Sequence, residues 1–114
     1  MSIIGEIKDF ILGAYKFVTY LKKRRLSQEE KELLISAAPR GEILRMSTHE
    51  TGDWIRVGNK DFFDTNDPAH AAKYIKAFES LESRGYVRHE TGMLYMLTAS
   101  GFKKARKLAR KKQR

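Results

Sequence analysis

The stretch LESRGYVRHETGMLYMLTASG, residues 81–101, decides the fold prediction for this chain. Gly85 follows a helical pattern and can end that helix in the left-handed conformation. The segments YVRHE and MLYML, on either side of Thr91-Gly92, predict two strands joined by a tight turn. Thr98 is then positioned to cap another helix. The stretch therefore predicts a two-stranded hairpin between two helices.

The chain before this stretch predicts a helix over residues 68–84. Asp67 can cap this helix, and Pro68 takes the first helical position, where its missing N–H leaves no hydrogen bond unmade. Apolar residues then recur at spacings of three and four, which is typical of a helix with one buried face. The residues expected on this face are Ala71 or Ala72, Ile75, Phe78 and Leu81.

Residues 42–63 predict β structure in three short segments. EILRM and WIRV are strand candidates separated by a loop, and KDFF returns after a tight turn at Gly58-Asn59. Ahead of these segments, Ser27 and Glu30 have the spacing of a capping box, so the segment SQEEKELLISAA predicts another helix. The body of the chain therefore predicts an α+β fold.

Residues 3–21, IIGEIKDFILGAYKFVTYL, have the pattern of an amphipathic helix. Its apolar face needs a partner, which can be the chain's own domain, a second copy of the chain or another protein. The strand MLYML is apolar on both faces, and this helix is the candidate cover for its second face. A membrane surface is disfavoured, because Glu6 and Asp9 lie on the polar face and the basic residues cluster at one end. The docking or dimerisation face consists of Ile3, Ile7, Phe10, Ile11, Ala14, Phe17, Val18 and Leu21.

The basic residues of the chain concentrate in two short segments. The net charge is +9 over 114 residues, yet residues 26–101 contain nine basic and twelve acidic residues. Residues 22–25 read KKRR, and residues 102–114 contain eight basic residues and no acidic one. This distribution divides the chain into an N-terminal helix with a basic junction (1–25), a folded core (26–101) and a basic C-terminal helix or tail (102–114).

The composition also excludes several classes of protein. Without cysteine the chain has no disulfide and no cysteine-based zinc site, as is usual for a cytoplasmic protein. No apolar run approaches the roughly 20 residues that a membrane span needs. His49, His70 and His89 are not at metal-ligand spacing, and no nucleophile stands in a catalytic motif. We therefore expect no metal, no cofactor and no enzymatic activity.

The order of a helix, L-x-x-x-G-Y-V-x, a turn, Y-x-L-T-x-x-G and a further helix resembles the C-terminal half of a winged-helix domain. The whole layout is similar to a winged-helix variant at the end of many uncharacterised bacterial proteins, in which β structure such as WIRVGNKDFF replaces a short helix. The resemblance implies a recognition helix at residues 68–84 and a wing at 88–93, and it favours a homodimer. The residues that carry the resemblance are Leu81, Gly85, Tyr86, Val87, Tyr95, Leu97, Thr98 and Gly101.

Basic residues on these elements are candidates for binding duplex DNA. Asp61, Asp64 and Asp67 precede the implied recognition helix, and their carboxylates would repel the phosphates that such a helix approaches. We therefore predict weak or non-specific, salt-dependent binding rather than sequence readout. The alternative is a non-catalytic protein–protein interaction or dimerisation module with no nucleic-acid ligand, whose basic tail keeps the protein soluble. The candidate DNA-binding residues are Lys73, Lys76, Arg88, His89, Lys103, Lys104, Arg106, Lys107, Arg110 and Lys111.

Overall fold

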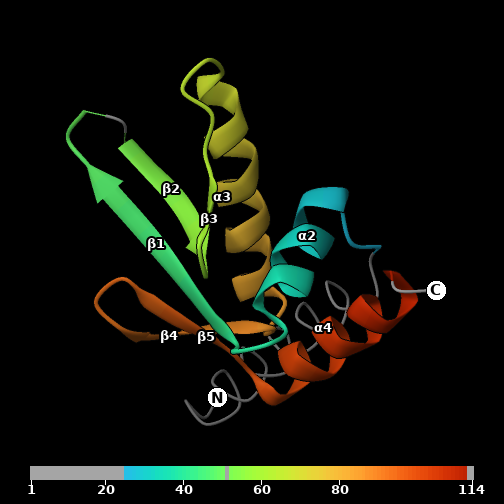
Figure 1. Cartoon of the computed structure of the whole chain (residues 1–114). Helices are drawn as coiled ribbons and strands as arrows, with labels where there is room; N and C mark the ends of the chain where they lie inside the picture. The colour runs from blue at the N-terminus through green and yellow to red at the C-terminus, as the bar shows by residue number, and fades with distance from the viewer. Residues whose placement is uncertain (1–24, 51, 113–114) are drawn as a thin grey trace, which may run out of the picture.

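The computed structural model describes residues 25–50 and 52–112, which form three helices and five strands (Figure 1). The predicted α+β class is confirmed. The helix predicted over residues 3–21 lies outside the described residues. In chain order the elements are α2 (Gln28–Ala37), β1 (Glu42–Thr48), β2 (Gly52–Val57), β3 (Lys60–Phe62), α3 (Pro68–Ser83), β4 (Val87–Thr91), β5 (Leu94–Leu97) and α4 (Ala99–Lys112).

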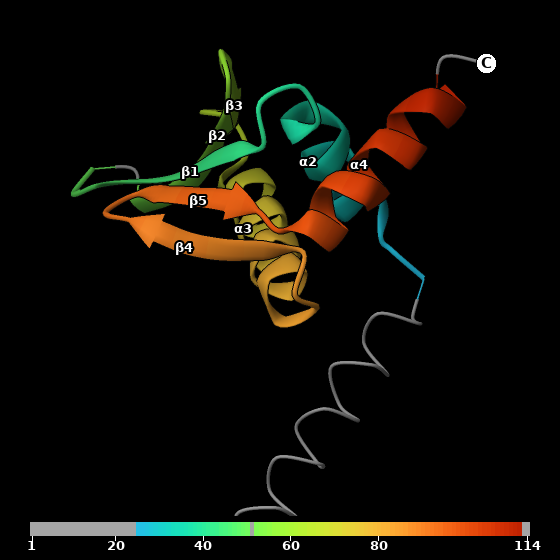
Figure 2. The ribbon, with the colours of Figure 1, turned by 90° about the horizontal axis from the view of Figure 1, so that it is seen from below.

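The five strands form one antiparallel sheet in the order β3-β2-β1-β5-β4. The segment 42–63, predicted as β structure, supplies β1, β2 and β3. Gly58 has a φ of 60° in the turn between β2 and β3, as the predicted tight turn requires. β1 pairs with β2 on one side and with β5 on the other, and Figure 2 shows β5 between β1 and β4. β1 therefore connects the two halves of the sheet.

The capping box predicted at Ser27 is present at the start of α2. Ser27 Oγ accepts a hydrogen bond from the backbone N–H of Glu30 at 3.2 Å, and Glu30 Oε1 accepts one from the backbone N–H of Ser27 at 3.1 Å. These bonds satisfy N–H groups that have no partner inside the helix. After the helix, Gly41 turns the chain with a φ of 74° and leads into β1.

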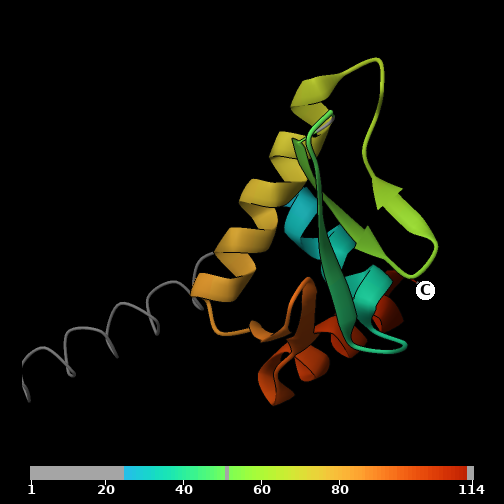
Figure 3. The same ribbon diagram turned by 90° about the vertical axis from the view of Figure 1, so that its left-hand side faces the viewer.

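α3 lies along one face of the sheet and packs against β2, β3 and β4 (Figure 3). Asp67 Oδ1 accepts a hydrogen bond from the N–H of Ala69 at 3.1 Å, so the predicted cap is confirmed. Of the two alanines left open for the buried face, the structure buries Ala71. Tyr74 is not among the residues predicted on the buried face. In the structure it is buried, and its ring centroid lies 4.7 Å from that of Phe62. This contact turns the buried side of α3 toward β3.

The hairpin of β4 and β5 turns at Gly92-Met93, one residue later than the prediction of Thr91-Gly92. Thr91 still pairs with Leu94, and the register shifts between His89 and Thr91. This irregularity is a β-bulge, in which one strand carries an extra residue. The extra residue moves the turn along the chain and leaves Met93 at the tip, 51% exposed.

The core lies between the sheet and the apolar sides of all three described helices. The ring of Phe78 on α3 meets the ring of Tyr95 on β5 edge to face, with centroids 4.7 Å apart. α4 contributes Ala105, which is completely buried, so the basic helix is part of the packed domain. Within residues 25–50 and 52–112, no helix has the length and apolar character to cross a membrane. The largest completely buried side chains are Phe62, Phe78, Leu33, Leu34, Ile43, Ile55 and Leu81.

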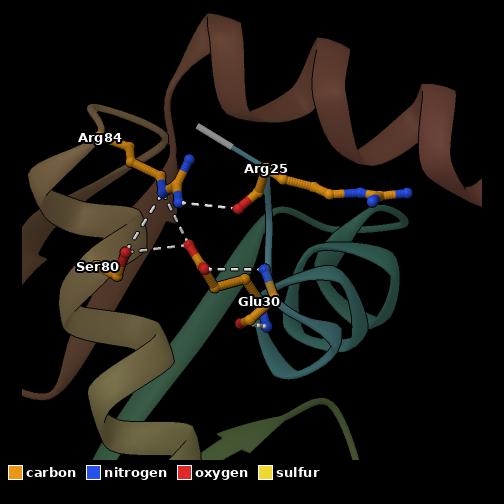
Figure 4. A network of polar contacts seen from close by, with 5 residues as sticks. Arg25, Glu30, Ser80 and Arg84 are labelled. Carbon is orange, nitrogen blue, oxygen red and sulfur yellow. Dashed lines mark hydrogen bonds and ion pairs between the residues drawn. The ribbon is translucent and has the colours of Figure 1, made fainter. Parts of the chain in front are cut away.

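A buried ion pair joins the start of α2 to the end of α3 (Figure 4). Arg84 Nε lies 2.9 Å from Glu30 Oε2, and only 4% and 6% of the two side chains are exposed. Ser80 Oγ donates to the same carboxylate oxygen at 3.1 Å. Arg84 Nη2 also donates to the carbonyl oxygen of Arg25 at 3.4 Å. Both charges therefore have the additional hydrogen bonds that a buried pair requires.

A second polar link between α2 and α3 is the hydrogen bond from the Tyr74 hydroxyl to Glu32 Oε2, at 2.6 Å. Burial, this bond and the negative charge of Glu32 raise the pKa of Tyr74 from 10.0 to about 12. The folded state therefore favours the neutral phenol. Its contribution to stability is complete below pH 10 and is lost as the pH rises from 10 to about 12.

We expect Tyr74→Phe to weaken the pH dependence of stability in this alkaline range. The variant cannot ionise at this position, so its free energy of unfolding should fall less steeply from pH 10 to about 12 than that of the native protein. Urea titrations followed by circular dichroism across this range measure the difference. Equal slopes for the two proteins would contradict the assignment.

Candidate nucleic-acid interface

The basic helix α4 is held in place by its first turn. Thr98 Oγ1 accepts a hydrogen bond from the N–H of Gly101 at 3.1 Å and donates to the carbonyl oxygen of Gly85 at 2.7 Å. Gly101 lies directly against the backbone carbonyl of Tyr86, where a Cβ atom would collide with the oxygen. The cap predicted at Thr98 is confirmed, and the absence of a side chain at Gly101 permits the close contact with Tyr86. They fix α4 to the end of the β4–β5 hairpin.

Six of the seven cations of α4, all except Lys112, form two rows along the helix. The first row, here called the Lys104 row, consists of Lys104, Lys107 and Lys111. The positive charges of Lys31 and Arg84 act on Lys104 in this row. Residues at these spacings of three and four share a helix face. The second row, here called the Arg106 row, lines an open groove together with Ala38, Pro39 and Phe102; its members are Lys103, Arg106 and Arg110.

The positive charges of α4 are not neutralised by any carboxylate of the described residues. Burial, followed by the charges of Lys107, Lys111, Lys31 and Arg84, holds the pKa of Lys104 below its ordinary value. Among residues 25–50 and 52–112, no Lys or Arg of α4 has a carboxylate oxygen within 4.0 Å, since the five ion pairs lie elsewhere. An anion placed against α4 would relieve this mutual repulsion.

The two candidate lysines of α3 share a second groove with the start of α2. Lys73 and Lys76 line this groove, and Arg25 and Arg84 line it as well. Glu29 and Glu30 are also present, so the groove has mixed charge. The groove and α4 are connected through α2, which packs against both α3 and α4. The α3 candidates and the α4 candidates therefore lie on two helices that share α2 as a neighbour.

The two candidates on the β4–β5 hairpin, Arg88 and His89, do not form a pair. They are adjacent in a strand, so their side chains point to opposite faces of the hairpin. Arg88 makes an ion pair with Glu90 at 2.9 Å and is largely exposed. His89 Nε2 is hydrogen-bonded to the carbonyl oxygen of Gly92 at 2.9 Å, and its ring contacts that of Tyr95. His89 therefore supports the hairpin turn, whereas Arg88 has no contact with the turn.

The acidic residues before α3 each have a structural partner. Asp61 accepts hydrogen bonds from Arg56 and from the indole of Trp54, and these bonds hold the pKa of its carboxyl below the ordinary value. Asp64 accepts from the backbone N–H of Asn66 at 2.9 Å, and Asp67 caps α3. These carboxylates form the turn and the helix start, at the opposite end of α3 from Arg84.

Sequence reasoning missed Lys31, Arg84 and Phe102 as parts of this region. Lys31 and Arg84 come from α2 and from the end of α3, and contacts between elements so distant in sequence leave no local pattern. Phe102 had a local signal, because its spacing of three from Ala105 places both residues on one side of α4. Its ring lies 5.2 Å from the guanidinium carbon of Arg106, at the floor of the open groove. The predicted docking residues of segment 3–21 lie outside the described residues.

No family model, no curated protein and no solved structure matches this chain. The described residues also contain no group of three or more His, Cys, Asp or Glu side chains placed to hold a metal ion. The class that the structure defines is a compact α+β domain in which a basic helix packs against the end of a five-stranded antiparallel sheet.

Proposed function

We propose that this protein is a winged-helix-like module that binds duplex DNA by charge, without reading its sequence. The observation that carries the proposal is α4, whose charged residues are all basic and have no carboxylate partner within the described part of the chain. Cations that are already unneutralised lose no internal ion pair when they meet phosphate.

The arrangement of elements supports the winged-helix-like assignment. α3 leads through a short connection into the β4–β5 hairpin, which corresponds to the helix and wing of that family. β2 and β3 occupy the place where an ordinary winged helix has a short helix. This difference leaves the start of α3 next to Asp61, Asp64 and Asp67. In this protein the DNA would therefore meet α4 and the Lys73–Lys76 side of α3, rather than the first turn of α3.

Phosphate binding by such a surface is independent of sequence. Lysine ammonium groups and arginine guanidinium groups each neutralise phosphate charge, and the released counterions drive the association. The early turns of α3 carry no Asn, Gln or Arg for bidentate contacts to base edges. The expected behaviour is a steep salt dependence with little preference among duplex sequences.

We expect Lys107→Gln/Lys111→Gln to weaken binding to a labelled duplex, measured by fluorescence anisotropy across a salt series. The slope of log K against log salt concentration should become shallower by about 0.9 for each phosphate that the variant no longer neutralises. Both residues are exposed on α4, so the domain should keep its fold.

The matched control is Lys60→Gln/Arg56→Gln, which removes the same charge from the β2–β3 edge of the sheet, away from α4. It should leave the slope unchanged. If the control reduces the slope as much as the α4 variant does, net charge alone drives binding and the assigned surface is wrong. Lys73→Gln/Lys76→Gln tests whether α3 shares the surface, and an unchanged slope there would confine binding to α4.

A second function, protein–protein interaction without a nucleic-acid ligand, has one specific observation in its favour. The face of the sheet that points away from α3 carries a strip of apolar side chains, among them Leu44, Trp54 and Leu94, that are not part of the core cluster. This strip need not compete with DNA binding, because it lies on different residues.

A further inference from the structure

The face of the sheet that points away from α3 carries five large apolar side chains. Ile43 and Tyr95 are register partners on the face that packs with α3. Since side chains alternate along a strand, Leu44 and Leu94 point to the other face, where they are also register partners. The same alternation defines the set, here called the apolar strip: Leu44, Met46, Trp54, Leu94 and Met96.

The apolar strip is continuous and separate from the core. Met46 and Trp54 are register partners, so the strip runs from β5 across β1 to β2. The core cluster takes residues from α2, α3 and α4 together with the other sheet face, and no member of the strip belongs to it. All five side chains keep part of their surface exposed. A contiguous apolar surface of this kind marks a contact site.

Two ion pairs flank the strip, and Glu42, the register partner of Met96, adds a carboxylate at the end of β1 on the same face. At the β3 edge, Arg56 Nε lies 2.6 Å from Asp61 Oδ1, and at the β4 edge Arg88 is paired with Glu90. Trp54 Nε1 donates to Asp61 Oδ1 at 3.1 Å, so the polar atom of the indole is satisfied within the face. An apolar centre with a polar rim suits an apolar partner without a large net charge. It does not suit a polyanion.

We infer that residues 3–21 of this chain dock on the apolar strip. The segment has no net charge, since Lys8 and Lys16 balance Glu6 and Asp9. Its apolar residues recur at helical spacing, and a helix of that length extends about 28 Å. Five strands spaced about 4.8 Å apart give a sheet about 20 Å wide, so one such helix can cross the whole strip.

The path of the chain agrees with this occupant. The carbonyl oxygen of Arg25 is held by Arg84. Arg84 stands three residues before Val87, where the edge strand β4 begins. Residues 3–21 therefore leave the domain close to an edge of the sheet that carries the strip. This inference is independent of DNA binding, because it uses none of the basic residues of α3 or α4.

Cysteine cross-linking tests the contact, and the chain contains no cysteine of its own. Full-length Phe10→Cys/Leu94→Cys should cross-link efficiently with a short bismaleimide. Asp9→Cys/Leu94→Cys is the control, because Asp9 lies on the opposite side of the predicted helix, and its yield should be several-fold lower. A product of monomer mass means docking within one chain. A product of dimer mass means docking on a second copy, and both support the assignment of the segment.

Trp54 supplies an independent readout, because it is the single tryptophan of the chain and lies in the strip. Acrylamide should quench the fluorescence of Trp54 several-fold more efficiently in full-length Phe10→Glu than in the native protein. The control Lys8→Glu should leave the quenching unchanged. Equal cross-linking of the two cysteine pairs, with unchanged quenching in Phe10→Glu, overturns the inference. The inference is also overturned if the protein is a dimer in which Trp54 is protected from acrylamide in both the native protein and Phe10→Glu. The sheet faces of two copies would then cover each other.

Discussion

Replacing Arg84 with alanine is expected to lower the free energy of unfolding by about 3–5 kcal/mol, the range found when one partner of a buried ion pair is removed. Glu30 would keep its charge in a site where its side chain is 6% exposed, with Ser80 as a remaining hydrogen-bond donor. The link to the carbonyl oxygen of Arg25 would also be lost. Because small domains are stable by about 5–15 kcal/mol, this one change removes a large part of the total. Urea unfolding followed by circular dichroism measures it.

Two further variants separate the cost of an unpaired buried charge from other causes of the lost stability. Arg88→Ala removes an arginine whose ion pair is exposed, and it should cost at most about 1 kcal/mol. Glu30→Gln/Arg84→Met removes both charges, and glutamine can still complete the capping box with Ser27. The double variant should be more stable than Arg84→Ala. If it is less stable, the cost lies in lost packing rather than in an uncompensated carboxylate.

Gly101→Ala is expected to be the second most damaging change, at about 3 kcal/mol, the upper end for overpacking in a packed interior. The new Cβ would collide with the carbonyl oxygen of Tyr86 and would stand 3.3 Å from Leu97 Cβ. The Tyr86 oxygen accepts the N–H of Thr98 at 2.9 Å, so it cannot withdraw without losing that bond. α4 would have to move away from the sheet. Thermal unfolding gives the loss in stability.

The matched control is Gly52→Ala. Gly52 has a φ of 76° but no atom within 4 Å of its Cβ position, so alanine there adds conformational strain of about 1–2 kcal/mol without a collision. Gly101→Ala should be clearly the more destabilising of the two. The opposite order would mean that α4 adjusts to the added methyl group and that the contact with Tyr86 does not fix its position.

Features that depend on neighbouring residues could be predicted from the sequence. The caps at Ser27, Asp67 and Thr98 are hydrogen bonds between residues two or three positions apart, and the structure contains all three. The turn at Gly58 likewise depends on one backbone angle. Such signals locate the ends of helices and strands, and the α+β class follows from their order.

Features that depend on distant residues could not be predicted. The ion pair of Glu30 and Arg84 joins positions 54 residues apart, and nothing in either local sequence indicates the other partner. Tyr74 differs in part, because its spacing of three from Ala71 and four from Phe78 is that of the buried face, whereas its partner Phe62 has no local signal. The candidate DNA surface has the same limit. Its lysines and their rows on α4 follow from composition and helical spacing, but the approach of Lys31 to Lys104 exists only after α2 packs against α4.

The pairing of β1 with β5 has a consequence for how the chain folds. β1, β2 and β3 are successive in sequence, so their hairpins can form quickly. The pairing of Ile43 with Tyr95 forms later, because Tyr95 lies 52 residues further along the chain. Until then one edge of β1 has no partner, and its backbone groups can pair with another chain. On a ribosome this interval lasts until the second hairpin has emerged. The nascent chain is therefore most vulnerable to misassociation after its first half has formed and before its second half arrives.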